Sequence, residues 1–297
     1  MSGTDFERAY RQAAQLVERE LEGCFLEQGP QRELLEAMRY SLLAGGKRLR
    51  PVLTLKVCQA LCGDMEPALD YACAVEMLHT YSLIHDDLPC MDDDDLRRGK
   101  PTNHKIYGEA TAVLAGDGLL TAAFETALGE DSPLPPQRVV AAAACLARAA
   151  GAQGMVGGQV LDMAAEGRAV SRYDVEQLQK LKTGALLSAA AEMGCIVAGG
   201  SEEAQKAVRR YAQKLGMAFQ VRDDMLDVEG NEATLGKPVG SDQANEKTTF
   251  VSLLGMDDCR ALVEKLTGEA VEALAPFGAE RAGFLCWLAE ALAGREN

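Results

Sequence analysis

Residues 71–95 read YACAVEMLHTYSLIHDDLPCMDDDD, a mostly apolar segment that ends in clustered aspartates. Apolar side chains recur in it with a period near 3.6, which predicts an amphipathic helix over 66–88. The same period predicts helices over 5–28, 31–44, 51–61, 110–129, 136–150, 174–199, 202–228 and 258–293, the last interrupted near Pro276 and Gly278. No alternating segment with a hairpin turn and no internal repeat is found. The sequence therefore predicts an all-α fold in a single domain spanning 1–297.

The composition is that of a globular protein, with 47% hydrophobic and 25% charged residues. A formal net charge of −15 argues against binding to nucleic acid or to anionic lipid surfaces. Nine cysteines without a C-x-x-C pair, beside three histidines, indicate reduced thiols rather than a zinc site. The N-terminus has no signal-like apolar run, and the longest apolar stretch, Val139–Ala147, is too short to span a bilayer. A cytoplasmic location is expected.

The aspartates of DDMLD, at 223–227, lie near the end of the helix predicted over 202–228. Gln220, Asp223, Asp224 and Asp227 stand at positions i, i+3, i+4 and i+7, which share one face of a helix. Carboxylates stacked on one face repel one another unless a cation lies between them. The spacing therefore indicates a cation site at this helix end.

The first cluster, HDDLPCMDDDD at 85–95, has the spacing D-D-x-x-x-x-D. Pro89 cannot donate to the carbonyl of His85, so the helix is expected to kink or stop there. The chain can then return Asp92 to the neighbourhood of Asp86 and Asp87. Carboxylate oxygens with room for water and phosphate suit Mg²⁺. Solvated acidic helix ends are the simpler interpretation of one cluster alone, but two clusters that each end a long helix favour a divalent-ion site.

The segment GGKRLRP, at 45–51, concentrates positive charge in an acidic chain. Pro51 suits the first position of a helix, and the glycines before Lys47 and Arg50 allow a loop whose N–H groups face an anion. Arg48 stands where a Walker A loop requires Ser or Thr, so a nucleotide-binding loop of that type is excluded. A solvated run of charges remains the alternative.

Further polar residues lie near these motifs. Arg97 and Arg98 follow the first cluster and can each address a different anion, or pair with neighbouring aspartates. His79 and Ser82 share a helix face with Asp86, at i, i+3 and i+7, so His79 is expected to point into the same space.

Two other lysines are candidates for binding an anion. Lys182-Thr183 interrupts an apolar helix. Lys237 lies in the polar, aperiodic segment 229–249, and a loop this long is usually functional or disordered.

Together these segments resemble the trans-isoprenyl diphosphate synthase family, and within it the bacterial farnesyl diphosphate synthase type. The resemblance covers nearly the whole chain. It rests on GGKRLRP, HDDLPCMDDDDLRRG, GGQVLDM, KTGALL, FQVRDDMLD and LGKPVGSD, in that order. It implies a helical bundle around a central cavity. Gln179 is a departure, because relatives often carry histidine before the K-T-G motif.

The resemblance also assigns roles. It implies that several Mg²⁺ ions, with Mn²⁺ as a substitute, are bound by Asp86, Asp87, Asp92, Asp223, Asp224 and Asp227. It implies that the allylic diphosphate is held by Arg97, Lys182 and Lys237, and isopentenyl diphosphate by Lys47, Arg50, His79 and Arg98. It implies that catalytic groups at the reacting carbon include Asp86, Asp87, Asp223, Lys182, Thr183 and Gln220. Homodimers are usual among relatives.

The expected reaction follows from this chemistry. The metal ions and cations neutralise the departing diphosphate, the allylic C–O bond ionises, and the double bond of isopentenyl diphosphate attacks the cation. The adduct then loses a proton, which the released diphosphate can accept. Water must be excluded, and the segment 229–249 is the expected lid. By resemblance, Tyr81, five residues before the first aspartate, acts with Ser82 as the floor that favours the C15 product, farnesyl diphosphate.

Three alternatives remain. The nearest is a geranylgeranyl diphosphate synthase of the same family. A class I terpene cyclase usually has one aspartate-rich motif with a different partner motif, and two aspartate clusters argue against it. A silent partner subunit would be expected to have lost aspartates, and both clusters are intact.

Overall fold

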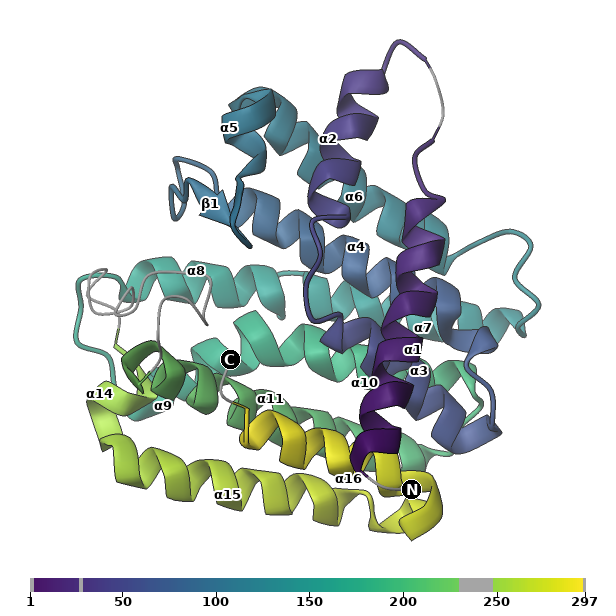
Figure 1. Ribbon diagram of the computed structural model, residues 1–297, viewed down its shortest axis with the longest axis vertical. Coiled ribbons are helices and arrows are strands. Elements are labelled where there is room, and N and C mark those ends of the chain that lie inside the picture. Colours follow the sequence, from purple (N-terminus) through teal and green to yellow (C-terminus); the bar gives the residue numbers. More distant parts are fainter. Residues whose placement is uncertain (1–2, 27–28, 230–247, 296–297) are drawn as a thin grey trace.

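The computed structural model describes residues 3–26, 29–229 and 248–295, and these parts are almost entirely helical (Figure 1). The long helices are α1 (Gly3–Glu22), α2 (Arg32–Leu42), α3 (Leu49–Cys62), α4 (Leu69–Asp86), α6 (Glu109–Ala127), α7 (Pro136–Ala150), α8 (Met155–Ala165), α10 (Ala185–Val197), α11 (Glu202–Glu229), α15 (Met256–Ala273) and α16 (Ala279–Ala293). Short helices are η1 (Glu66–Ala68), α5 (Asn103–Tyr107), α9 (Arg172–Gln179), η2 (Lys180–Gly184), α14 (Phe250–Leu254) and η3 (Ala275–Phe277). The predicted all-α class is confirmed.

Three of the helices form the centre of the bundle. Helices α3, α4 and α10 bury residues on every side, whereas α1 and α2 bury a single stripe. A helix that is apolar all round belongs in an interior, and an amphipathic one belongs at the surface. Accordingly α4 packs against α6 and α3, α10 packs against α3, α7 and α11, and α11 packs against α15.

Several sequence predictions need correction. Helix α1 ends at Glu22, short of residue 28. Helices α5, α8 and α14 were not expected at all. The helix predicted over 174–199 is α9, a π-helical turn η2, and α10 in succession. A two-residue hairpin also exists: β1 (Leu96–Arg97) pairs antiparallel with β2 (Lys100–Pro101).

The hairpin escaped the sequence analysis because its turn is unusual. Arg98 and Gly99 both have positive φ, 55° and 74°, as a two-residue I′ turn requires. Asn or Asp normally precedes the glycine of such a turn, and arginine gives no such signal. Its conformation is explained by tertiary contacts of the Arg98 side chain, described below.

Residues 136–165 form the only described segment long and apolar enough for a membrane span by length and composition, with 44% of the window buried. The segment is not one straight helix, because residues 151–154 separate α7 from α8. Helices of 15 and 11 residues are each shorter than the roughly 20 residues that a span needs.

The close approach of α10 to α3 depends on Gly194. A Cβ atom at this position would overlap the backbone oxygen of Thr54. We expect Gly194→Ala to lower the free energy of unfolding by about 1–3 kcal/mol, because two packed backbones cannot yield to a methyl group. Urea denaturation followed by circular dichroism measures this change.

The matched control is Gly268→Ala on α15, where a Cβ atom would meet nothing within 4 Å. It should raise stability by about 0.5–1 kcal/mol, because alanine favours a helix over glycine. Equal effects of the two substitutions would contradict the role given to the α3–α10 contact.

Candidate active site

The turn after α4 returns the chain on itself as the sequence predicts. Helix α4 ends at Asp86, and Pro89 follows in a turn. The backbone N–H of Asp92 then donates to the carbonyl of Asp86, with N–O 2.9 Å. Asp92 is thus placed beside Asp86, and its charge contributes to a higher Asp86 pKa.

Burial raises the pKa values of the first aspartates, whereas neighbouring cations lower them. Burial raises the pKa of Asp86 to about 6, while Lys182 opposes the rise. Burial also raises the pKa of Asp87, although Arg97 donates to Asp87 Oδ1 from Nε at 2.9 Å. Arg97 also contacts Asp94, with N–O 3.1 Å. Arg97 therefore neutralises carboxylates of the first cluster.

A cationic region lies next to this turn. Arg50 Nη1 lies 3.4 Å from His79 Nε2. Burial, together with Arg50 and Arg98, holds the pKa of His79 well below its ordinary value, so its imidazole is neutral. Partial burial lowers the pKa of Lys47, and the positive charge of Arg295 lowers it further. The structure thus brings together Lys47, Arg50, His79 and Arg98, the four residues expected to bind one diphosphate.

Arg48 departs from the expected anion-binding loop. Its side chain is 2% exposed and forms an ion pair with Glu76 on α4, with Nη1–Oε1 2.6 Å. It also donates to the carbonyl of Leu42 at 2.9 Å. A left-handed backbone at Arg48, with φ 51°, turns this side chain inward. Glu76 was missed by the sequence analysis, although an acidic residue inside an apolar helix, one turn before His79, was the available signal.

The hairpin and the GGKRLRP loop are joined by Arg98. Its guanidinium donates to the carbonyl of Gly45 and lies against Gly46, where a Cβ atom would overlap it. Gly46 has φ 126°, so glycine is needed there both for its backbone and for this contact. Arg98 therefore fixes the loop that carries Lys47.

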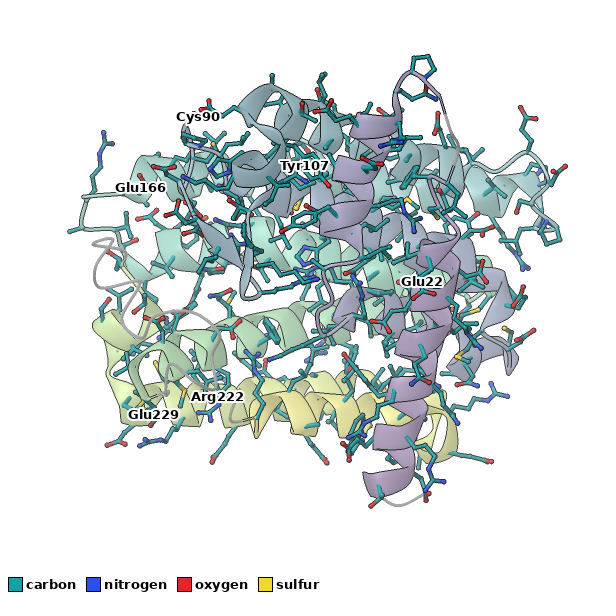
Figure 2. All side chains as sticks on the ribbon, turned by 45° about the horizontal axis from the view of Figure 1, so that its top comes forward. Glu22, Cys90, Tyr107, Glu166, Arg222 and Glu229 are labelled. Carbon is teal, nitrogen blue, oxygen red and sulfur yellow. The ribbon has the colours of Figure 1, made fainter. Side chains whose placement is uncertain are left out.

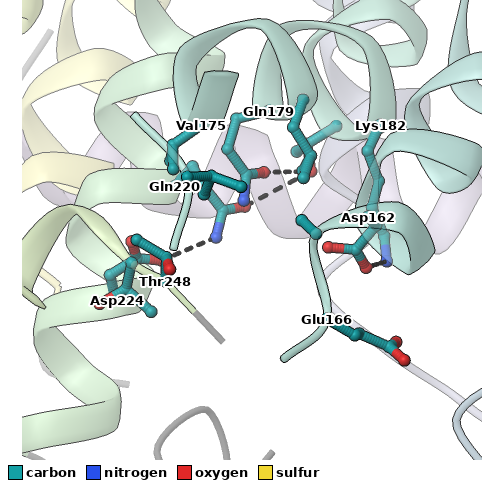
Figure 3. Close-up of a pocket in the computed structure, with 13 residues that line it drawn as sticks. Asp162, Glu166, Val175, Gln179, Lys182, Gln220, Asp224 and Thr248 are labelled. Atoms are coloured by element: carbon teal, nitrogen blue, oxygen red, sulfur yellow. Dashed lines mark hydrogen bonds and ion pairs between the residues drawn. The ribbon is translucent and has the colours of Figure 1, made fainter. Parts of the chain in front are cut away.

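A chain of hydrogen bonds links η2 to the second cluster (Figure 3). Thr183 Oγ1 lies 3.4 Å from the side-chain oxygens of both Gln179 and Gln220. Gln220 Nε2 donates to Asp224 Oδ1 at 2.9 Å, and the N–H of Phe250 donates to Asp224 Oδ2 at 2.8 Å. Gln179, noted above only as a departure, is thus part of the site.

Lys182 leaves η2 toward the first cluster. Its Nζ pairs with Asp162 Oδ2 of α8 at 2.5 Å, and its charge acts on Asp86. Helix α8 lies close enough for this pair because of Gly158, where a Cβ atom would overlap the backbone of Lys182. A π-helical turn often marks a functional site. Here it carries the two polar residues that lie between the aspartate clusters.

Asp223 is held by a residue that the sequence analysis did not consider. Arg295, after α16, donates to Asp223 Oδ1 and stacks on Phe219 with its Cζ 3.9 Å from the ring centroid. Arg222 in turn holds the carbonyl of Arg295, with N–O distances of 2.9 and 2.7 Å. Arg222 also pairs with Glu229 at 3.5 Å, near the end of α11 (Figure 2). The C-terminal end of the described chain thus borders the site.

A mostly apolar cavity of about 480 Å³ adjoins these polar groups. Its polar end includes Arg50, His79, Asp86, Lys182 and Thr183. Its apolar walls include Tyr81, Leu88, Met91, Met155, Val156, Val160 and Met163. Both residues expected to set chain length, Tyr81 and Ser82, line this cavity.

Carboxylates of the two clusters border one region rather than opposite surfaces. Asp86 lines the same cavity as Arg50, and the charge of Asp223 acts on Arg50. Among the described residues, however, no three Asp, Glu, His or Cys side chains converge as a formed metal site. Lys237 and most of the segment 229–249 lie outside the described residues.

The Arg48–Glu76 pair generates a stability prediction. We expect Glu76→Leu to lower the free energy of unfolding by about 3–5 kcal/mol, because it leaves a buried guanidinium without its main partner. The double variant Arg48→Met with Glu76→Leu should lose much less, because neither charge remains buried. Urea denaturation of the two singles and the double measures the coupling, and additive losses would contradict it.

The chain is similar to known proteins over nearly its whole length. The family model described as polyprenyl synthetase matches residues 31–275. A chloroplastic geranylgeranyl pyrophosphate synthase of Capsicum annuum is 49% identical over 88% of this chain and 71% of its own length. One from Catharanthus roseus is 46% identical over 100% of this chain and 83% of its own.

Solved structures share the fold of this chain but differ from one another in the product that they name. An FPP/GFPP synthase from Zymomonas mobilis has a TM-score of 0.88 at 39% identity, over 99% of this chain and 100% of its own. A geranylgeranyl pyrophosphate synthetase from Pyrococcus horikoshii has a TM-score of 0.88 at 31% identity, over 98% of each chain. Both curated relatives carry the name that was the alternative above, rather than the expected farnesyl one.

Proposed function

Because the chain belongs to the polyprenyl synthetase family, we propose that it condenses isopentenyl diphosphate with allylic diphosphates to give geranylgeranyl diphosphate. The observation that carries the proposal is the junction of charged and apolar space at Lys182 and Thr183. Both residues line the apolar cavity and also the polar pocket that contains Gln220 and Asp224. Such a junction suits a substrate with an anionic head and a hydrocarbon tail.

We propose Mg²⁺ as the cofactor, and some of the clustered aspartates are suited to bind it. Asp86 and Asp92 are neighbouring carboxylates whose mutual repulsion a divalent ion would relieve. Asp223 and Asp227 are candidates on α11. Both oxygens of Asp224 accept protein hydrogen bonds, so its proposed role as a ligand requires exchange of Gln220 or of the Phe250 N–H. When bound, the metal supplies Lewis-acid stabilisation of the leaving diphosphate.

The chain's own residues orient the two substrates. Lys182 and Arg97 can neutralise the allylic diphosphate after exchanging their present carboxylate partners. Arg50 has a buried Nε without a hydrogen-bond partner among the described residues, and it can address the diphosphate of isopentenyl diphosphate. The side-chain oxygen atoms of Thr183 and Gln220, which lie 3.4 Å apart, would stabilise the allylic cation. The apolar walls of the cavity would help to keep water from that cation once a substrate fills the space between them.

Farnesyl diphosphate is the second candidate product. Tyr81 favours it, because this buried aromatic ring, 7% exposed, stands in the wall along which the growing chain would extend. The names of the two chloroplastic relatives favour geranylgeranyl diphosphate, whereas the similar structure from Zymomonas mobilis is named an FPP/GFPP synthase. The size of the wild-type product decides between them.

A homodimer in the cytoplasm remains part of the proposal. Apolar side chains are exposed on α6 and α8, including Leu114 at 57% and Val160 at 61%. A second copy could cover such a surface.

The function is tested with isopentenyl diphosphate, each allylic starter and Mg²⁺. We expect geranylgeranyl diphosphate to accumulate, EDTA to abolish turnover, and added Mg²⁺ or Mn²⁺ to restore it.

Asp86→Asn should lower kcat by roughly 100-fold or more, because a proposed ligand of the metal that stabilises the leaving group is lost. The control Asp93→Asn removes a charge from the same run at an exposed position where asparagine tolerates the φ of 50°. No condensation by the wild type would refute the proposed function.

Tyr81→Ala tests the cavity wall. Removing the ring should extend the product by at least one five-carbon unit, measured by chromatography of the dephosphorylated products. Tyr81→Phe keeps the ring and should keep the wild-type product. An unchanged distribution in the alanine variant would show that Tyr81 does not limit the chain.

A further inference from the structure

His85, on α4 beside the proposed catalytic aspartates, packs against α6. Its Nε2 lies 3.0 Å from the backbone oxygen of Val113. A carbonyl oxygen only accepts, so Nε2 carries the proton and donates. The ring is also a wall of the apolar cavity, together with Val113 and Tyr81.

The position of the ring depends on Gly116. A Cβ atom on this residue would overlap three atoms of the His85 imidazole, which therefore occupies the space that any other side chain would fill. Gly116 is buried within α6 and has no requirement for a positive φ. Since glycine in the middle of a helix is unfavourable, the contact with His85 is the structural reason for it.

His85 in turn supports Tyr81. The two residues are four apart on α4, and their rings meet edge to face, with centroids 5.5 Å apart and planes at 88°. Gly116, His85 and Tyr81 thus form a continuous series of contacts from the backbone of α6 to the cavity wall. An edge-to-face aromatic pair resists displacement of either ring.

We propose that Gly116 and His85 determine product length together with Tyr81. The absence of a side chain at Gly116 lets His85 recede against α6, and His85 then sets how far Tyr81 stands from the growing hydrocarbon chain. The limit on the product is therefore set by two helices rather than by one aromatic residue. The inference rests on the proposed function, because it concerns the hydrocarbon that this cavity receives.

The test is Gly116→Ala, measured by product chromatography and by the rate of the first condensation. The added methyl group should push His85 and Tyr81 into the cavity. We expect the ratio of the longest product to the next shorter one to fall by about tenfold, because the displaced rings would take up space that only the longest hydrocarbon chain needs. The first condensation should proceed near the wild-type rate, because its product is short.

Gly118→Ala is the matched control. It places the same methyl group on the same helix, but there it meets the flexible Met38 side chain, with Sδ at 2.8 Å. It should leave the product distribution unchanged. Adding His85→Ala to Gly116→Ala should restore longer products, because the displaced ring is gone.

The outcomes separate the two proposals. No condensation by the wild type would refute the proposed function. Condensation with an unchanged distribution in Gly116→Ala would overturn the inference alone. Should Gly116→Ala fail to fold, as seen by circular dichroism, His85→Ala decides: longer products support the inference, and the wild-type distribution overturns it.

Discussion

The buried ion pair between Arg48 and Glu76 is the contact on which the cationic half of the site depends. It joins the start of α3 to the middle of α4, and Arg48 also holds the end of α2 through the carbonyl of Leu42. Arg48 turns inward, whereas Arg50 lines the cavity and Lys47 lies within electrostatic reach of Asp223. Glu76 also acts electrostatically on Arg50 and Arg98, so one buried carboxylate balances several cations. Removing a single partner would leave a charge buried without compensation.

The rest of the site obeys the same constraint, which is that charges of one sign cannot be gathered in a half-buried space without partners. In the described chain Arg97 contacts Asp87, Lys182 contacts Asp162, and Arg295 contacts Asp223. Each pair compensates a charge that the site gathers. On our proposal, substrate and metal ions would take their place, and binding would then exchange one set of ion pairs for another rather than bury new charge.

The apolar cavity shows how packing can add specificity to this chemistry. Its polar end is built from residues with defined hydrogen bonds, whereas its depth depends on ring positions fixed by helix contacts. Two glycines at helix contacts shape this region. Gly158 allows α8 to approach Lys182, and Gly116 allows His85 to lie against α6. Neither glycine needs an unusual backbone. Each is explained only by what occupies the space of its missing side chain.

The sequence by itself determined the helical class, the turn that returns Asp92 to Asp86, and the shared face of Gln220, Asp224 and Asp227. These features depend on residues within seven positions of each other, where the periodicity of a helix and the missing N–H of Pro89 suffice. Only the tertiary structure decided which arginine of GGKRLRP turns inward. It also decided which carboxylates form ion pairs with Arg97, Lys182 and Arg295, and in which direction Tyr81 points. Arg48 and Arg50 are chemically identical, and only the left-handed backbone at Arg48 and the distant Glu76 distinguish them. The partners of these charges lie 10 to 72 residues away, so local pattern carries no information about them.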